Sequence, residues 1–200
     1  MNYDNKMMEM IKDIGKGERL LLHACCAPCS SLVLERLANH FSITIFYYNP
    51  NISDGVEYQK RIDEIKKLIS LVDSSYPINL IEGEYNPDTF FDMAKGLESE
   101  PERGKRCYKC YLLRLEETAK MAEKLDFPYF CTTLTLSPHK NSNWLNEIGE
   151  DLDKKYNSTY LYSDFKKRGG YQRSIELSHE YDLYRQDYCG CIYSKKNFTK

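Results

Sequence analysis

The stretch that decides the fold is Arg19-Leu20-Leu21-Leu22-His23-Ala24-Cys25-Cys26-Ala27-Pro28-Cys29-Ser30-Ser31. Residues 19–24 form a short apolar run that predicts a buried strand. Pro28 followed by two serines is typical of a helix start, and leucines at 32, 34 and 37 give this helix an apolar face up to about residue 39. The first cysteines therefore lie where a strand passes into a helix.

The same alternation continues along the chain. An amphipathic helix precedes the first strand, with Met7, Met8, Ile11 and Ile14 on one face. Further strands are predicted at residues 41–48, 78–81, 129–133 and 159–162, and further helices at 56–72, 87–97, 108–125, 137–156 and 171–185. Such alternation is typical of a parallel sheet with helices on both faces. We expect an α/β, Rossmann-like (HUP-like) fold of about five strands in a single domain spanning residues 1–200.

Seven of the eight cysteines are clustered, as Cys25-Cys26-x-x-Cys29, Cys107-x-x-Cys110 and Cys189-x-Cys191. A chain of this length buries roughly 70% of the surface that its unfolded form exposes, so it needs no disulfide staples. The apolar run near the N-terminus is too short for a signal peptide or a membrane span, and we expect the chain to stay in the cytoplasm. In that reducing compartment, clustered cysteines favour metal binding or redox turnover.

The formal net charge of −2 argues against a global positive field for nucleic-acid binding. Local basic segments nevertheless lie in or beside stretches that carry cysteines or glycines. They are Arg103, Lys105, Arg106 and Lys109; Lys166, Lys167, Arg168 and Arg173; and Lys195, Lys196 and Lys200. Ordinary solvated surface charge is the alternative for each segment. Their placement modestly favours an anionic substrate.

The first cysteine group sits at the predicted helix start, where positive potential and unpaired backbone N–H groups stabilise thiolates. A single cysteine there would most simply be a small buried residue, but three so close together indicate chemistry. His23 lies on the strand. A buried, hydrogen-bonded histidine is the simpler interpretation, and the functional alternative is a histidine that contacts a metal ligand. Cys131 stands alone in a predicted strand, and we interpret it as core packing.

The second group, Cys107-Tyr108-Lys109-Cys110, leads into a helix, where residues three apart share a face. Alone, it suits a thioredoxin-type redox pair or half of a zinc site as well as a cluster. Zinc modules usually keep their pairs close in sequence, whereas iron–sulfur ligation needs only that the fold brings four thiolates together. The long separation from the first group therefore favours iron–sulfur ligation.

The third group, Cys189-Gly190-Cys191, is too short for an unstrained disulfide. A strained pair is comparatively easy to reduce, which suits a catalytic dithiol. Metal ligation by one or both cysteines is an equal alternative. The sequence also lacks a Gly-rich dinucleotide fingerprint, a Walker sequence and a pyrophosphatase-type loop, which argues against ATP hydrolysis and direct nicotinamide use.

Four motifs follow one another along the chain: Leu22-His23-Ala24-Cys25-Cys26-Ala27-Pro28-Cys29-Ser30, Arg106-Cys107-Tyr108-Lys109-Cys110-Tyr111, Thr132-Thr133-Leu134-Thr135-Leu136-Ser137-Pro138-His139-Lys140-Asn141, and Phe165-Lys166-Lys167 through Gly170-Tyr171 to Tyr188-Cys189-Gly190-Cys191. Together they resemble the QueH family of epoxyqueuosine reductases. The resemblance covers nearly the whole chain. It implies reduction of the epoxide of epoxyqueuosine in the tRNA anticodon loop, the last step of queuosine synthesis, by iron–sulfur chemistry without cobalamin.

The resemblance also implies residue roles. Cys25, Cys26, Cys107 and Cys110 would bind a 4Fe-4S cluster, and Cys189 with Cys191 would be a redox-active pair. The family allows an additional mononuclear iron beside the cluster, so all seven clustered cysteines, Cys29 included, are candidate metal ligands. An external electron donor is then required. Some members carry an aspartate at the position of Cys29, so this residue could distinguish the chain within the family.

Epoxide opening to an alkene consumes two electrons and two protons and releases water, so a general acid is needed. His139 and Asp187 are the candidates from the sequence, with surface or capping roles as their alternatives. Tyr108, Tyr111 or Tyr171 could stack on exposed bases. Two rival functions remain: an iron–sulfur tRNA thiolation enzyme, which would need the missing pyrophosphatase loop, and a zinc-stabilised RNA-binding module.

Overall fold

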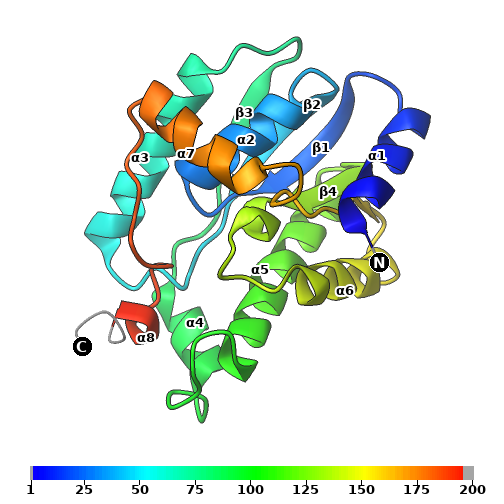
Figure 1. Cartoon of the computed structure of the whole chain (residues 1–200). Coiled ribbons are helices and arrows are strands. Elements are labelled where there is room, and N and C mark those ends of the chain that lie inside the picture. Colours follow the sequence, from blue (N-terminus) through cyan, green and yellow to red (C-terminus); the bar gives the residue numbers. More distant parts are fainter. Residues whose placement is uncertain (1, 196–200) are drawn as a thin grey trace.

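A five-stranded parallel sheet forms the centre of the computed structural model, which describes residues 2–195 (Figure 1). The strand order is β3-β2-β1-β4-β5, and each neighbouring pair is parallel. The strands are β1 (Glu18–His23), β2 (Phe41–Tyr47), β3 (Ile78–Glu82), β4 (Tyr129–Thr132) and β5 (Thr159–Tyr160). This order is that of doubly wound sheets, and it confirms the predicted Rossmann-like α/β architecture.

Helices cover both faces of the sheet (Figure 1). They are α1 (Tyr3–Asp13), α2 (Ala27–Leu37), α3 (Gly55–Leu71), α4 (Pro87–Ala94), α5 (Lys105–Lys124), the 3₁₀ helix η1 (Thr133–Leu136), α6 (Ser142–Asp153), α7 (Gly170–Glu180) and α8 (Ile192–Lys195). Helices α2, α3 and α7 pack on one face, and α5 and α6 on the other. In residues 2–195, no helix is both long enough and apolar enough to cross a bilayer.

The apolar residues of β1 divide between the two cores because successive side chains of a strand point to opposite faces. Leu20 and Leu22 join the core beneath α2 and α3, whereas Leu21 joins the core beneath α5 and α6. All three side chains are fully buried. The central strand is therefore apolar on both sides, as a sheet covered on both faces requires.

The reversal in strand order places the end of β1 at the point where the chain switches direction across the sheet. β1 pairs with β2 on one side and with β4 on the other. The connections that leave β1 and β4 diverge there, which opens the crevice where ligands bind in such folds. The loop with Cys25 follows β1 directly, and the backbone N–H of Cys25 donates to the hydroxyl of Thr133 after β4 at 3.4 Å. The first cysteine group thus lies at the switch point.

Several predicted helix boundaries are wrong, among them the end of the helix predicted at 87–97, which ends at Ala94. The helix predicted at 137–156 begins only at Ser142, because η1 precedes it and Asn141 caps it by accepting from the N–H groups of Asn143 and Trp144. The helix predicted at 171–185 ends at Glu180, and Asp182 follows with a φ of 49° that an α-helix does not allow. The helix predicted at 108–125 begins at Lys105.

The early start of α5 has a local cause. Glu100 accepts a hydrogen bond from the backbone N–H of Lys105 at 3.0 Å, which satisfies a donor at the helix start. The guanidinium of Arg106 donates to the backbone carbonyls of Leu97, Glu98 and Glu100. The polar connection before α5 is therefore tied to the helix, and Cys107, which the predicted start at 108 left outside, lies within the helix together with Cys110.

Candidate functional site

A cavity of about 380 Å³ lies at the carboxyl ends of the strands. Six of the seven clustered cysteines line it: Cys25, Cys29, Cys107, Cys110, Cys189 and Cys191. Cys26 does not line the cavity, but its sulfur lies 3.6 Å from that of Cys25. The fold therefore brings together three cysteine groups that are far apart in the sequence.

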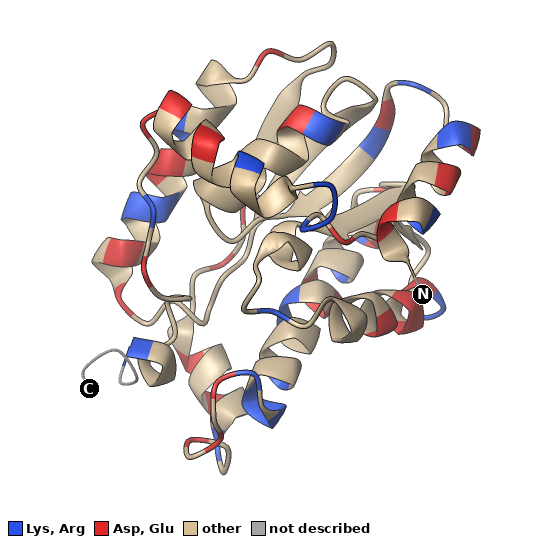
Figure 2. Cartoon of the chain, viewed as in Figure 1, with Lys and Arg blue, Asp and Glu red and all other residues tan. Residues whose placement is uncertain are grey.

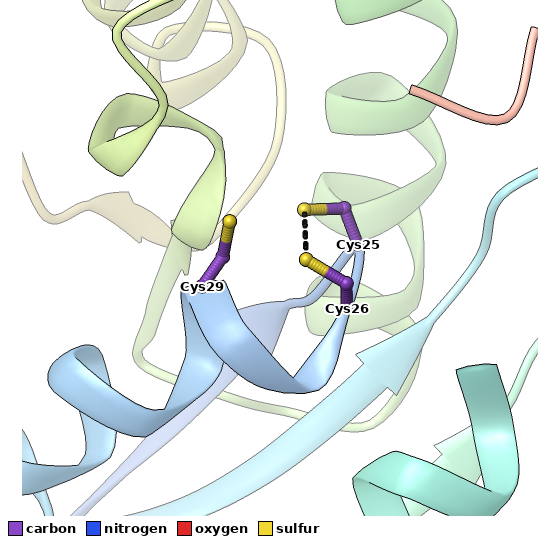
Figure 3. Close-up of side chains that lie close together, drawn as sticks. All are labelled: Cys25, Cys26 and Cys29. Carbon is purple, nitrogen blue, oxygen red and sulfur yellow. Dashed lines mark hydrogen bonds between the residues drawn. The ribbon is translucent and has the colours of Figure 1, made fainter. Parts of the chain in front are cut away.

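The first group forms a compact set of sulfur atoms at the start of α2. The ligand atoms of Cys25, Cys26 and Cys29 all lie within 4.8 Å of one another. Figure 3 shows the sulfurs of Cys25 and Cys26 side by side, with that of Cys29 projecting from the first turn of α2. Cys26 is the residue that precedes the helix, and Pro28 occupies its first turn. This strand-to-helix junction thus presents three thiols at the positive end of a helix.

The three thiols of this group titrate together. Hydrogen bonds from the thiols of Cys26 and Cys29, aided by the charges of Lys140 and Arg114, hold the pKa of Cys25 well below its ordinary value. The thiol of Cys26 has a pKa raised to about 11 because it donates to Cys25. Hydrogen bonds to Cys25 and Cys26 likewise raise the pKa of Cys29. The three sulfurs therefore share one negative charge, which favours binding of a cation.

The second pair lies at the start of α5. Cys107 is half-buried, Cys110 is buried, and both face the cavity. The backbone N–H of Arg103 donates to the sulfur of Cys107 at 3.3 Å. Burial raises the pKa of Cys107 and raises that of Cys110 to about 11, so both are thiols when no metal is bound.

The third pair lies between α7 and α8. The sulfur of Cys189 lies 3.1 Å from the hydroxyl of Ser194, and its pKa is held well below the ordinary value by hydrogen bonding from Cys191 and by Lys140. The pKa of Cys191 is raised by the same contact with Cys189. Both cysteines are free thiols in this structure. A thiolate beside a protonated thiol is the arrangement of a reactive dithiol.

The segment that carries the third pair is held by the loop after β2 and by α3. The amide of Asn51 donates to the carbonyl of Cys189 at 3.1 Å, and the backbone N–H of Ser53 donates to that of Gly190 at 3.3 Å. The guanidinium of Arg61, which forms an ion pair with Glu57 at 2.7 Å, also donates to the carbonyl of Cys189. Together these contacts fix the backbone between the two cysteines.

Several cations of the cavity wall were not predicted from the sequence, and Arg114 and Lys140 are two that influence the cysteine thiols. Arg114 is buried on α5, one turn after Cys110. Lys140 is half-buried; burial lowers its pKa, but the neighbouring Cys25, Cys29 and Cys189 outweigh burial and raise it. The spacing of Arg114, four residues after Cys110 on a predicted helix, was a signal that could have placed it beside the cysteines.

The two candidate acids lie at the mouth of the cavity. His139 and Asp187 both line it, and both are exposed. The guanidinium of Arg103 lies 2.9 Å from Nδ1 of His139. Since a guanidinium only donates hydrogen bonds, Nδ1 is the acceptor and the ring proton of His139 lies on Nε2.

The simpler interpretations of His23 and Cys131 are confirmed. His23 is buried with Nδ1 3.0 Å from the hydroxyl of Thr132 and Nε2 3.1 Å from the carbonyl oxygen of Tyr48. Burial lowers its pKa to about 3, so it is a neutral, fully hydrogen-bonded core residue. Cys131 is buried in β4 and its thiol lies 3.2 Å from the carbonyl oxygen of Leu161.

Figure 2 shows basic and acidic segments mixed along the helices in view. In the segment before α7, Lys166 lies 3.0 Å from Asp164 and Arg168 pairs with Asp4 at 2.7 Å. In the first turn of α7, Arg173 pairs with Glu35 at 2.6 Å. These contacts favour a structural role for that segment. Arg103, Lys105 and Lys109, near the second cysteine pair, are exposed. Lys196 and Lys200 lie outside the described residues.

The donor set suits a thiolate-bound metal. Thiolate ligands select zinc and iron–sulfur clusters over hard cations such as magnesium and calcium. Three sulfur atoms already lie close together, and four further cysteines converge on the same cavity. Arg114 lines the same cavity, and its buried Nε has no hydrogen-bond partner among the described residues. The residues present therefore fit a negatively charged, sulfur-ligated group.

Comparison with known proteins identifies relatives along most of the chain. The family profile described as "Epoxyqueuosine reductase QueH" matches residues 20–197. Epoxyqueuosine reductase QueH of Streptococcus pyogenes serotype M1 is 43% identical over 201 residues, which covers 98% of this chain and 79% of that protein. The protein of the same name from Thermotoga maritima is 35% identical, with 88% and 89% covered. The chain therefore belongs to the QueH family of epoxyqueuosine reductases.

Proposed function

We propose that this chain reduces the epoxide of epoxyqueuosine in tRNA to the alkene of queuosine, inside the cavity that six of its cysteines line. Membership of the family supports the assignment of this reaction. The convergence of the three cysteine groups supports the assignment of this cavity as the active site. The proposal needs no cobalamin. The cytoplasmic location stays a prediction from the sequence.

The proposed cluster ligands are Cys25, Cys26, Cys107 and Cys110, from the start of α2 and the start of α5. A 4Fe-4S cluster bound there would supply electrons one at a time. Cys29, whose sulfur lies with those of Cys25 and Cys26, is then the thiol left for an additional iron. Supporting this assignment, the two helix starts face one cavity and carry five cysteines between them.

The third pair has the chemistry of a two-electron donor. Oxidation of two thiols to one disulfide releases two electrons and two protons, which balances the conversion of an epoxide to an alkene and water. The lowered pKa of Cys189 beside the raised pKa of Cys191 keeps one sulfur as thiolate and the other protonated. An external reductant, thiol or one-electron carrier, must then return the pair to the dithiol.

The leaving oxygen needs a proton at the mouth of the cavity. His139 is the better placed candidate, because the hydrogen bond from Arg103 leaves its Nε2–H free to donate. Asp187 also lines the mouth and stays a candidate. Both residues reach solvent, so either can be reprotonated between turnovers.

The entrance offers contacts for a nucleotide. Tyr171 lines the cavity and is 39% exposed, which makes its ring accessible to a base, whereas Tyr111 is buried and Tyr108 packs edge-on against Trp144. Arg103, with Lys105 and Lys109 nearby on α5, supplies exposed positive charge for phosphates. The tRNA anticodon loop is therefore the proposed partner.

The test is the reaction with tRNA that carries epoxyqueuosine, with chemical reductant, and with nucleoside mass spectrometry as the readout. We expect queuosine to form with the wild type and with Cys131→Ala, which removes a thiol outside the cavity. Cys107→Ala should abolish the product. Equal product from both variants would remove the second pair from the centre.

Metal analysis of protein purified without oxygen separates this proposal from its rivals. We expect about four or more irons with sulfide per chain. Zinc without iron or sulfide would instead support a zinc-stabilised RNA-binding module, because an all-thiolate site also suits zinc. ATP hydrolysis that depends on tRNA would support a thiolation enzyme.

A further inference from the structure

Three arginines of the cavity wall are almost fully buried, and their charges are balanced differently. Arg61 forms an ion pair with Glu57. Arg106 donates to three backbone carbonyls and lies 4.6 Å from the ring of Tyr193. Arg114 is 2% exposed and donates to the side-chain carbonyl oxygen of Asn49. Within residues 2–195, no carboxylate lies within ion-pairing distance of Arg114, and its Nε has no hydrogen-bond partner.

A buried charge without a counterion is expensive, with an effective penalty of several kcal/mol. Such a group persists when something else balances it. The groups that share the cavity wall with Arg114 include Cys25 and Cys110, and Cys110 lies one turn before it on α5. These two cysteines come from different groups, so one guanidinium borders both the start of α2 and the start of α5.

Arg114 is also held in place rather than free to turn towards solvent. Its partner Asn49, at the end of β2, donates through Nδ2 to the carbonyl oxygen of Ala24 at 2.8 Å. Ala24 directly precedes Cys25. A hydrogen-bonded path therefore runs from α5 through Asn49 to the backbone beside the first cysteine group, and it fixes the guanidinium close to both groups.

We propose that Arg114 is the charge-balancing residue of the cysteine centre, and that its guanidinium stabilises the more negative, reduced form of the group that the cysteines bind. The inference rests on the proposed iron–sulfur function. Adding an electron to a thiolate-bound cluster increases its negative charge, and a fixed positive charge in a dry site makes that step more favourable. Arg114 therefore raises the reduction potential of the cluster, without touching the substrate.

The test is a redox titration of the reconstituted full-length protein, followed by electron paramagnetic resonance, with iron and sulfide content measured on the same samples. Arg114→Met removes the charge and keeps most of the side-chain length. We expect a loss of at least about tenfold in the preference for the reduced cluster, which is about 59 mV to more negative potential for a one-electron couple. Arg114→Lys keeps the charge and should recover most of the shift.

Two matched variants separate charge from position. Asn49→Ala removes the hydrogen bond to Arg114 but keeps the arginine. The reduction potential should therefore shift less in this variant than in Arg114→Met. Arg36 pairs with Asp4 and does not line the cavity. The variant Arg36→Met should therefore leave the reduction potential unchanged. An unchanged potential in Arg114→Met, or an equal shift in Asn49→Ala, would overturn the inference.

Loss of the cluster is also an informative outcome. If Arg114→Met fails to hold iron and sulfide while Arg114→Lys holds both, the positive charge is required, as proposed. If both variants fail, the shape of the guanidinium matters rather than its charge, and the inference is wrong. A wild-type protein that binds zinc without iron or sulfide would instead overturn the proposed function, and this inference with it.

Discussion

The side-chain amide of Asn51 donates to the backbone carbonyl oxygen of Cys189 across 3.1 Å, which joins the loop after β2 to the segment that carries the third cysteine pair. The two residues are 138 positions apart in the sequence. The contact closes one side of the cavity, because both residues line it. The position of the third pair therefore depends on the end of the central sheet and not only on its own turn.

Replacement of Asn51 by alanine should loosen this segment. The lost hydrogen bond contributes about 0.5–1.5 kcal/mol to the free energy of unfolding, so we expect a modest fall in the melting temperature of the metal-free protein. The larger effect should be local: alkylation of Cys189 by iodoacetamide, followed by peptide mass spectrometry, should become faster. A rate equal to that of the wild type would show that Arg61 and Ser53 hold the segment without Asn51.

Gly190 should not tolerate a side chain. Its φ is 96°, and a Cβ there would lie 2.6 Å from Cγ1 of Ile52. Gly96 is a matched control, since its φ is 75° but a Cβ would meet nothing within 4 Å. Backbone strain alone costs of order 1–3 kcal/mol. We expect Gly96→Ala to lower the unfolding free energy and keep turnover per folded molecule.

Gly190→Ala should in addition displace the third pair, because the new methyl group forces the turn away from Ile52. The expected result is a loss of turnover that exceeds the loss of folded protein, measured by product formation against circular dichroism. Equal turnover per folded molecule in the two variants would contradict a requirement for close contact between Gly190 and Ile52.

The outcomes for Cys131 and Arg114 show where sequence reasoning succeeds and where it ends. Local patterns predicted the strands, the clustered cysteines and the core role of Cys131, because each depends on a short stretch of chain. The hydrogen-bond partner of Arg114, Asn49, lies in the loop after β2 and in turn donates to Ala24 just after β1, and spacing on one helix does not reveal these contacts. The predicted end of α7 was wrong for a related reason: the segment that follows is held by residues far away in the sequence, as where Glu64 accepts a hydrogen bond from the N–H of Tyr184.

The thiol of Cys131 should be inert in the folded protein. Burial raises its pKa to about 12, and the side chain is 1% exposed. At pH 8, iodoacetamide should therefore modify Cys131 only after the chain unfolds, whereas Cys189 should react early. Modification of Cys131 at the rate of Cys189 in native protein would show that β4 opens on the timescale of the reaction.

Tyr160 should make the protein less stable in alkali. Burial raises the pKa of its phenol well above the ordinary value of 10.0. In the unfolded chain the phenol ionises near pH 10, whereas the folded protein keeps it neutral. A raised folded pKa contributes stability that is fully present below pH 10 and is lost as the pH rises above it, by up to about 1.4 kcal/mol per pH unit.

Tyr160→Phe tests this directly, because the buried hydroxyl has no hydrogen-bond partner among the described residues. Removing an unpaired hydroxyl should leave the free energy of unfolding at pH 7 unchanged or higher, since its desolvation cost disappears. Urea unfolding from pH 7 to pH 11 should then show a shallower alkaline decline in the variant than in the wild type. The other tyrosines and the cysteines are present in both proteins, so the difference between the two curves reports the removal of the Tyr160 hydroxyl. Parallel curves would mean that its hydroxyl finds a partner or reaches water in the folded state.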